Sequence, residues 1–188
     1  ADIIAVHLEA GNACVQVYFI RSGQNWGNKD YYPKVGTDLS NSEILQAFLG
    51  QFYLNRESAR LILLSHEMEN KTLMQKLLSE KLQQSVKIIT PKKGEKRDLV
   101  LDVLRNANES LVRKMAENAT QLTMLNATTK ALGLEKRLNR IEVYDNSHIQ
   151  GSHAVGAMIV SGPEGFMRSE YRKFNIRLDE IQNRDDTA

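Results

Sequence analysis

The residues of this chain that are best suited to do chemistry lie around Asp145. This aspartate stands in a run rich in apolar residues that begins at Ile141, and polar residues and Gly151 follow it. An unpaired carboxylate costs several kcal/mol to bury, so an aspartate in such a run usually has a partner, often a metal ion. Mg²⁺ and Mn²⁺ prefer carboxylate oxygens, and two ions about 4 Å apart stabilise the attacking and leaving oxygens of a phosphodiester. One carboxylate is not a site, however, and the spacing alone favours an aspartate that bonds backbone amides in a turn.

Two histidines flank the turn after Asp145. His148 and His153 are five residues apart, which resembles a pair of zinc ligands. Glycine and serine between them form a loop, and no third or fourth ligand of suitable spacing is nearby. We therefore expect no zinc cluster in this segment.

Four cations surround the expected start of a long helix, where free backbone N–H groups and the helix dipole favour phosphate. Cations that neutralise phosphates give sequence-independent, salt-sensitive binding to nucleic acid. A solvated charge run is the alternative, and composition alone favours it. Arg172 and Lys173 are a weaker case of the same kind, and Trp26 either stacks on a base or, as we expect, packs over its own loop. The four cations are Lys92, Lys93, Lys96 and Arg97.

Composition limits the classes to which the chain can belong. The 188 residues are 41% hydrophobic and 26% charged, which is ordinary for a folded domain, and the net charge of +2 is too small to argue nucleic-acid binding by itself. The single cysteine, Cys14, excludes an internal disulfide and a cysteine-based zinc site and fits a reducing cytoplasm. No apolar run is long enough to span a membrane. Because the chain begins at Ala1 without a methionine or signal pattern, we expect a piece of a longer protein.

The hydrophobic pattern of residues 1–132 predicts the element order β-β-β-α-β-α-β-α. The unbroken apolar run at 61–64 is typical of a parallel strand buried on both faces. Leu73, Leu77, Leu78 and Leu82 are expected to face inward from the second helix. We expect strands at 3–9, 13–21, 29–35, 61–64 and 86–90, and helices from Ser40, over 71–82 and over 94–132.

This order is that of an RNase H-like α/β fold, in which an antiparallel hairpin sheet continues into parallel strands with helices packed on it. A second β-β-β opening follows from Arg140, with strands expected at 154–160 and 166–177. We therefore predict an RNase H-like mixed sheet with helices in residues 1–132, a linker at 133–139, and a truncated second RNase H-like β-meander in 140–188. The first strand has no carboxylate in its interior, so we expect the first domain to be degenerate and non-catalytic, serving as a scaffold or contacting DNA.

Residues 140–177 closely resemble the endonuclease domain of the UvrC family, the C subunit of the bacterial excinuclease. The resemblance is carried in register by residues 144–151, by 155–158 and by the segment Tyr-Arg-Lys-Phe-Asn-Ile at 171–176. Residues 1–132 are similar to the segment that precedes this domain in the family, most clearly at 23–27 and 91–97. The resemblance thus covers essentially the whole chain.

The resemblance implies a cytoplasmic protein that acts in nucleotide excision repair and the SOS response. Its implied partners are damaged double-stranded DNA and UvrB, which it would bind through a segment outside this chain. It implies that Asp145 is one catalytic residue and metal ligand of a site that incises DNA 5′ to a lesion, using Mg²⁺ or Mn²⁺ and no organic cofactor. His148 matches a family position and is expected to support the site through hydrogen bonds.

The resemblance also implies that the other catalytic residues lie beyond Ala188, so we expect the chain not to cut DNA by itself. A hypothesis of another class is a non-catalytic DNA- or protein-binding module on an RNase H-like scaffold.

Overall fold

The computed structural model describes residues 1–36, 38–149 and 152–176. The chain divides into two compact units, residues 1–114 (unit 1) and 115–188 (unit 2). The helix α3 (Glu95–Ala131) contributes to both. The predicted linker at 133–139 stays a prediction. None of the helices in the described ranges is long and apolar enough to cross a membrane.

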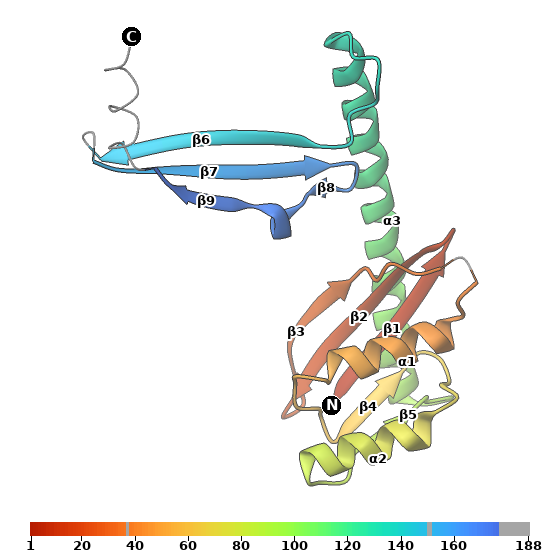
Figure 1. The fold of residues 1–188 in the computed structure, drawn as a ribbon. Coiled ribbons are helices and arrows are strands. Elements are labelled where there is room, and N and C mark those ends of the chain that lie inside the picture. Colours follow the sequence, from red (N-terminus) through yellow and green to blue (C-terminus); the bar gives the residue numbers. More distant parts are fainter. Residues whose placement is uncertain (37, 150–151, 177–188) are drawn as a thin grey trace, which may run out of the picture. The chain divides into compact units, whose positions relative to one another are not determined.

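Unit 1 is built on a five-stranded mixed sheet in the order β3-β2-β1-β4-β5 (Figure 1). Its first three strands pair antiparallel, and β1, β4 and β5 run parallel to one another. The predicted order of strands and helices in this region is therefore confirmed. The strands are β1 (Asp2–Glu9), β2 (Asn12–Arg21), β3 (Gln24–Tyr31), β4 (Leu61–Leu64) and β5 (Lys87–Ile89).

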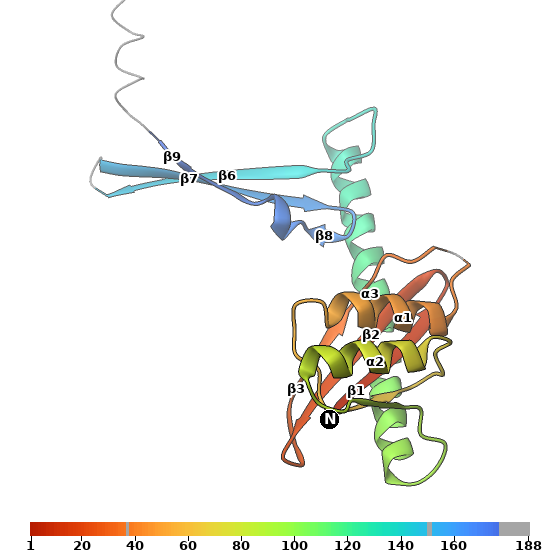
Figure 2. The same ribbon diagram turned by 60° about the horizontal axis from the view of Figure 1, so that its bottom comes forward.

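Two helices cover one face of this sheet, and the first part of α3 covers the other (Figure 2). They are α1 (Asn41–Phe52) and α2 (Lys71–Leu82). α1 begins where expected because Ser40 and Glu43 form a capping box: the serine side chain accepts from the Glu43 N–H, and the glutamate side chain accepts from the Ser40 N–H. Such a cap stabilises a helix by about 1 kcal/mol.

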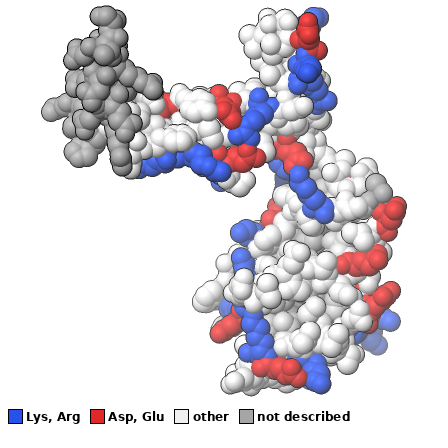
Figure 3. Space-filling view, viewed as in Figure 1, with Lys and Arg blue, Asp and Glu red and all other residues white. Residues whose placement is uncertain are grey.

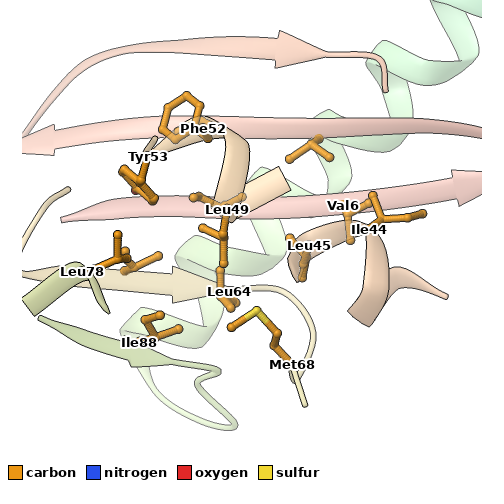
Figure 4. Packing of buried hydrophobic residues seen from close by; sticks show 14 of the residues in the cluster. Val6, Ile44, Leu45, Leu49, Phe52, Tyr53, Leu64, Met68, Leu78 and Ile88 are labelled. Atoms are coloured by element: carbon orange, nitrogen blue, oxygen red, sulfur yellow. The ribbon is translucent and has the colours of Figure 1, made fainter. Parts of the chain in front are cut away.

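The larger core cluster lies between the sheet and the two helices α1 and α2 (Figure 4). The smaller one lies on the α3 side, where Val100 and Val103 pack on the sheet. β4 takes part in both, because Ile62 and Leu64 point into the first cluster and Leu63 into the second. The prediction of a strand buried on both faces is confirmed.

The third strand begins earlier than predicted. Ser22 and Gly23 have positive φ values of 51° and 76°, as the two-residue turn of a tight hairpin requires, so β3 starts at Gln24 instead of at residue 29. The expected packing of Trp26 over its loop is also wrong, because 74% of this side chain is exposed.

The second helix has the predicted bounds but not the predicted apolar face. Leu78 is buried, whereas Leu73 and Leu77 are exposed. Met74 and Leu82 lie partly buried against the core and complete the contact. The helix is therefore held by a narrower stripe than its leucine content indicates.

Unit 2 holds an antiparallel sheet in the order β6-β7-β8, with β9 also paired to β7 (Figure 1). The expected strand at 166–177 is wrong as a single element, because a 3₁₀ turn at Arg168–Glu170 divides it. Whether this sheet opens a second RNase H-like domain stays a prediction. Its strands are β6 (Ile141–Ile149), β7 (Ser152–Gly162), β8 (Gly165–Phe166) and β9 (Arg172–Asn175).

Candidate active site and nucleic-acid interface

Asp145 lies in a row of three residues across the sheet of unit 2. It pairs with Ala157 on β7, and Ala157 pairs in turn with Lys173 on β9. Residues directly opposite one another in antiparallel strands project from the same face. Asp145, Ala157 and Lys173 therefore share one face, and all three are exposed.

The carboxylate of Asp145 is solvated rather than buried. Its neighbours Val143 and Tyr144 are 55% and 61% exposed, and no other described residue forms a hydrogen bond or ion pair with the Asp145 carboxylate. The expectation that this aspartate stands in a buried apolar strand is wrong. No partner is needed to offset desolvation, so the carboxylate is available to a ligand.

A second row of residues lies on the opposite face of the same sheet. Asn146 pairs with Gly156, and Gly156 pairs with Phe174. A Cβ on Gly156 would lie 3.0 Å from Asn146 Oδ1, so the glycine leaves room for the asparagine side chain. The alternation along β6 thus separates Asp145 from its neighbour Asn146.

The other carboxylates near the start of β6 are already engaged. Arg140 Nε donates to Glu142 Oε1 at 2.6 Å, Arg140 also pairs with Glu170, and the Tyr144 hydroxyl donates to Glu142 Oε2 at 2.6 Å. The bond from Tyr144 and the bond from Arg140 both lower the pKa of Glu142. The bond to Glu142 raises the pKa of Tyr144. This network ties β6 to the turn before β9, whereas Asp145 stays outside it.

The predicted role of His148 stays a prediction. The residue belongs to β6, at the register irregularity between Ser147 and Ile149, and its side chain lies outside the described residues. Within the described ranges, no three His, Cys, Asp or Glu side chains gather in a way that could hold a metal ion. The described residues therefore do not make up a divalent-metal centre, and we assign no catalytic step to a metal.

The aspartate in the first strand of unit 1 has a different environment. The Asp2 residue is 1% exposed, and its carboxylate accepts from Arg21 Nη1 and from the Tyr53 hydroxyl, each at 2.7 Å. Burial, followed by the negative charge of Asp2, raises the pKa of Tyr53 well above its ordinary value. Both carboxylate oxygens thus have partners, and Asp2 holds the start of β1 to β2 and to the end of α1.

His66 is a structural histidine. Its Nδ1 lies 2.8 Å from Ser65 Oγ and its Nε2 lies 3.2 Å from Asn41 Nδ2. Burial, then the charges of Arg97 and His7, lowers its pKa. Because both ring nitrogens are engaged, His66 joins the end of β4 to the start of α1.

The four cations predicted to bind nucleic acid lie where the parallel strands of unit 1 end, and we call them the basic edge: Lys92, Lys93, Lys96 and Arg97. After β4 the chain passes to α2 on one face, and after β5 it passes to α3 on the other. The carboxyl ends of such strands are a topological switch point, where ligands of open α/β sheets bind. The lysines are exposed, and none of the four side chains has a hydrogen-bond or ion-pair partner among the described residues.

The cations of β9 occupy both faces of the sheet in unit 2. Lys and Arg atoms gather along the strand labelled β9 in Figure 1, as the space-filling view shows (Figure 3). Lys173 shares the face of Asp145, whereas Arg172 pairs with Met158 and projects from the other face. The two cations are adjacent in the sequence, but the pleat of the strand places their side chains on opposite faces.

Unit 1 has a mixed sheet with helices, and unit 2 has an antiparallel sheet. Comparisons with known proteins identify the family. The family described as "UvrC Ribonuclease H-like domain" matches residues 1–114, and the one described as "UvrC RNAse H endonuclease domain" matches residues 129–188. The chain belongs to the UvrC family.

Curated relatives agree with this assignment. A UvrABC system protein C from Ruegeria pomeroyi is 56% identical over 186 residues, which cover 99% of this chain and 30% of the relative. A protein of the same name from Rhodopseudomonas palustris is 50% identical over 188 residues, which cover 100% of this chain and 27% of the relative. The chain thus spans less than a third of the length of these relatives. An exopolyphosphatase from Cytophaga hutchinsonii aligns with 98% of this chain and 53% of its own at a TM-score of 0.22 and 10% identity, which supports no argument.

Proposed function

We propose that an intact protein containing this chain hydrolyses a phosphodiester of damaged double-stranded DNA during nucleotide excision repair, on the 5′ side of the lesion. In this proposal Asp145 supplies one carboxylate of the reaction centre. The proposal rests on the exposed carboxylate of Asp145, which has no partner among the described residues and lies within the region matched as an endonuclease domain. The relatives' name, UvrABC system protein C, supports a role in that repair system.

The proposal includes a domain assignment. Residues 1–132 act as a non-catalytic RNase H-like domain, and residues 140–188 are the first strands of the nuclease domain. The match of separate family descriptions to residues 1–114 and 129–188 supports two functional parts. A divalent cation, Mg²⁺ or Mn²⁺, and the partner UvrB belong to the proposal through the family resemblance.

The proposal is tested by replacing Asp145 in the intact protein. Asp145→Asn keeps the size of the side chain but removes its charge, and Glu142→Gln is the matched control on the opposite face of the same strand. We expect D145N to lower the rate of 5′ incision in a lesion-containing duplex about 10³-fold or more, the scale on which catalytic groups act. DNA affinity should be unchanged and E142Q should incise normally. Incision by D145N at a rate within a few-fold of the unmodified protein would reject the proposal.

A second function is favoured for unit 1, that of a DNA-binding module. Its first-strand aspartate, Asp2, is held by two partners, whereas its basic edge has four cations without partners in the part of the chain that the structure describes. Unpaired lysine and arginine side chains at a helix start bind phosphates without reading sequence. This is the property that a repair nuclease needs to act at any sequence.

A further inference from the structure

We propose that Lys173 binds the phosphate that is cut, from the same face of the sheet as Asp145. The inference rests on the proposed function of Asp145. It goes further by separating two adjacent cations that the sequence treats alike, and by giving only one of them a place at the reaction centre.

The register of the sheet places Asp145 and Lys173 in one row. Asp145 on β6 and Lys173 on β9 both pair directly with Ala157 on β7, one from each side. Neighbouring strands are about 4.8 Å apart, so the backbones of these two residues are separated by about 10 Å. This span admits a phosphate group between the two side chains, because the lysine ammonium sits on a flexible four-carbon stem.

The residue between Asp145 and Lys173 in this row is small. Ala157 has a single methyl group, it is exposed, and no described side chain bridges Asp145 and Lys173 above it. A larger residue at this position would fill the surface between the two charges. The surface above Ala157 is therefore open, with an anion, Asp145, on one side and a cation, Lys173, on the other.

Among the described residues, Lys173 has no competing partner. The described residues give its ammonium no hydrogen bond and no ion pair, and none with Asp145. Arg172 Nη1, in contrast, donates to the Ser169 carbonyl at 3.1 Å and to the Tyr171 carbonyl at 2.8 Å. The arginine thus braces the turn before β9, whereas the lysine is available to an external anion.

Binding and cleaving a phosphodiester on this face requires positive charge. A phosphodiester carries one negative charge, and further charge develops on its oxygens as the bond to the leaving oxygen breaks. Asp145 is itself an anion and repels the phosphate. A cation on the same face offsets part of that repulsion, in addition to any divalent cation that the proposed function places there. Lys173 meets this need without reading the base sequence.

The test compares three variants of the intact protein: Lys173→Ala, Lys173→Arg and Arg172→Ala. We expect K173A to slow single-turnover 5′ incision by about 10²-fold, the effect of removing one donor from a charge-stabilising site. K173R should restore most of the rate, because it keeps the positive charge. R172A, the matched control on the same strand, should stay within about threefold in the rate and unchanged in lesion-DNA affinity.

A second readout does not depend on cleavage. A lesion duplex that carries an aldehyde on the sugar beside the expected incision position forms an imine with a nearby lysine amine, with loss of water, and borohydride reduces that imine to a stable link. In the uncleaving D145N protein, we expect the link to form at Lys173 and to disappear in D145N/K173R. R172A in the same background should leave it intact.

The outcomes separate the two proposals. If D145N still incises, the proposed function fails whatever Lys173 does. If D145N is inactive but K173A and R172A incise equally, or if K173R is as slow as K173A, the role of Lys173 is rejected while the role of Asp145 stands. Linking at a residue other than Lys173 would likewise overturn the inference.

Discussion

The first strand of each unit contains an aspartate, but the two aspartates have different environments. Asp2 on β1 is buried and has two partners, Arg21 and Tyr53, whereas Asp145 on β6 is exposed and has none among the described residues. Sequence patterns indicate the reverse, because Asp2 stands at a strand end and Asp145 within an apolar run. A carboxylate in a strand is structural when its oxygens are engaged by protein groups, and it is free for chemistry when they are solvated.

Outside the reaction centre, the largest effect on DNA binding is expected from replacing cations of the basic edge, because we propose that unit 1 binds DNA. Replacing Lys92 and Lys93 with alanine should lower the salt slope of lesion-duplex binding by about 1.8, since each phosphate contact contributes about 0.9. Adding K96A and R97A should lower it further. Titration of DNA binding against salt concentration measures the slope.

The control for this prediction is R60A/K87A. Both residues are exposed and lie at the opposite, amino ends of β4 and β5. Like K92A/K93A, this variant removes two positive charges. An equal loss of slope in the control and in K92A/K93A would show that only net charge matters. The distinction between the basic edge and the remaining surface of unit 1 would then be lost.

The next effect concerns the stability of the two aspartate variants. Asp2→Asn removes the charge that Arg21 and Tyr53 share in a buried position, so we expect the free energy of unfolding of unit 1 to fall by about 2 kcal/mol. Asp145→Asn should change stability by less than about 0.5 kcal/mol. Urea unfolding followed by far-UV circular dichroism measures both changes. Equal losses for the two variants would contradict the comparison.

A separate effect, confined to alkaline pH, is expected because unit 1 buries a titratable thiol. Burial, followed by the charge of Asp30, raises the pKa of Cys14 to about 12. The unfolded chain therefore releases this proton at lower pH than the folded chain. The contribution of this thiol to stability is constant below about pH 8 and falls as pH rises towards 12. Urea midpoints of unit 1 at pH 8 and pH 11 measure the fall.

The matched variant for the alkaline effect is Cys14→Ala. It should lower stability somewhat at pH 8, because it leaves a small cavity, but its stability should fall less between pH 8 and pH 11. A fall of the same size in C14A would assign the effect to other groups, above all to the buried Tyr53, whose pKa is also raised.

Much of the fold was predictable from local signals. The helix start at Ser40, the apolar run of β4 and the extent of α3 each depend on neighbouring residues, and each prediction is confirmed. The start of β3 was missed because the turn at Ser22 and Gly23 depends on positive φ values that the composition of the loop does not show.

The site was less predictable, because its properties depend on pairing between distant strands. The row of Asp145, Ala157 and Lys173 is defined by the register of β6, β7 and β9, which sequence spacing does not give. The signal that was available is the alternation along a strand: it places Arg172 and Lys173 on opposite faces wherever β9 pairs. The roles of His148 and of the basic edge stay predictions.

The two aspartates are distinguished by the rate of 5′ incision of a lesion-containing duplex, measured with the D2N and D145N forms of the intact protein at equal folded fraction. We expect the folded D2N protein to incise at the unmodified rate, because Asp2 acts on stability alone, and the D145N protein to lose incision while still binding DNA. Normal incision by D145N, or loss of incision in folded D2N, would contradict the assignment of a structural aspartate to unit 1 and a catalytic one to unit 2.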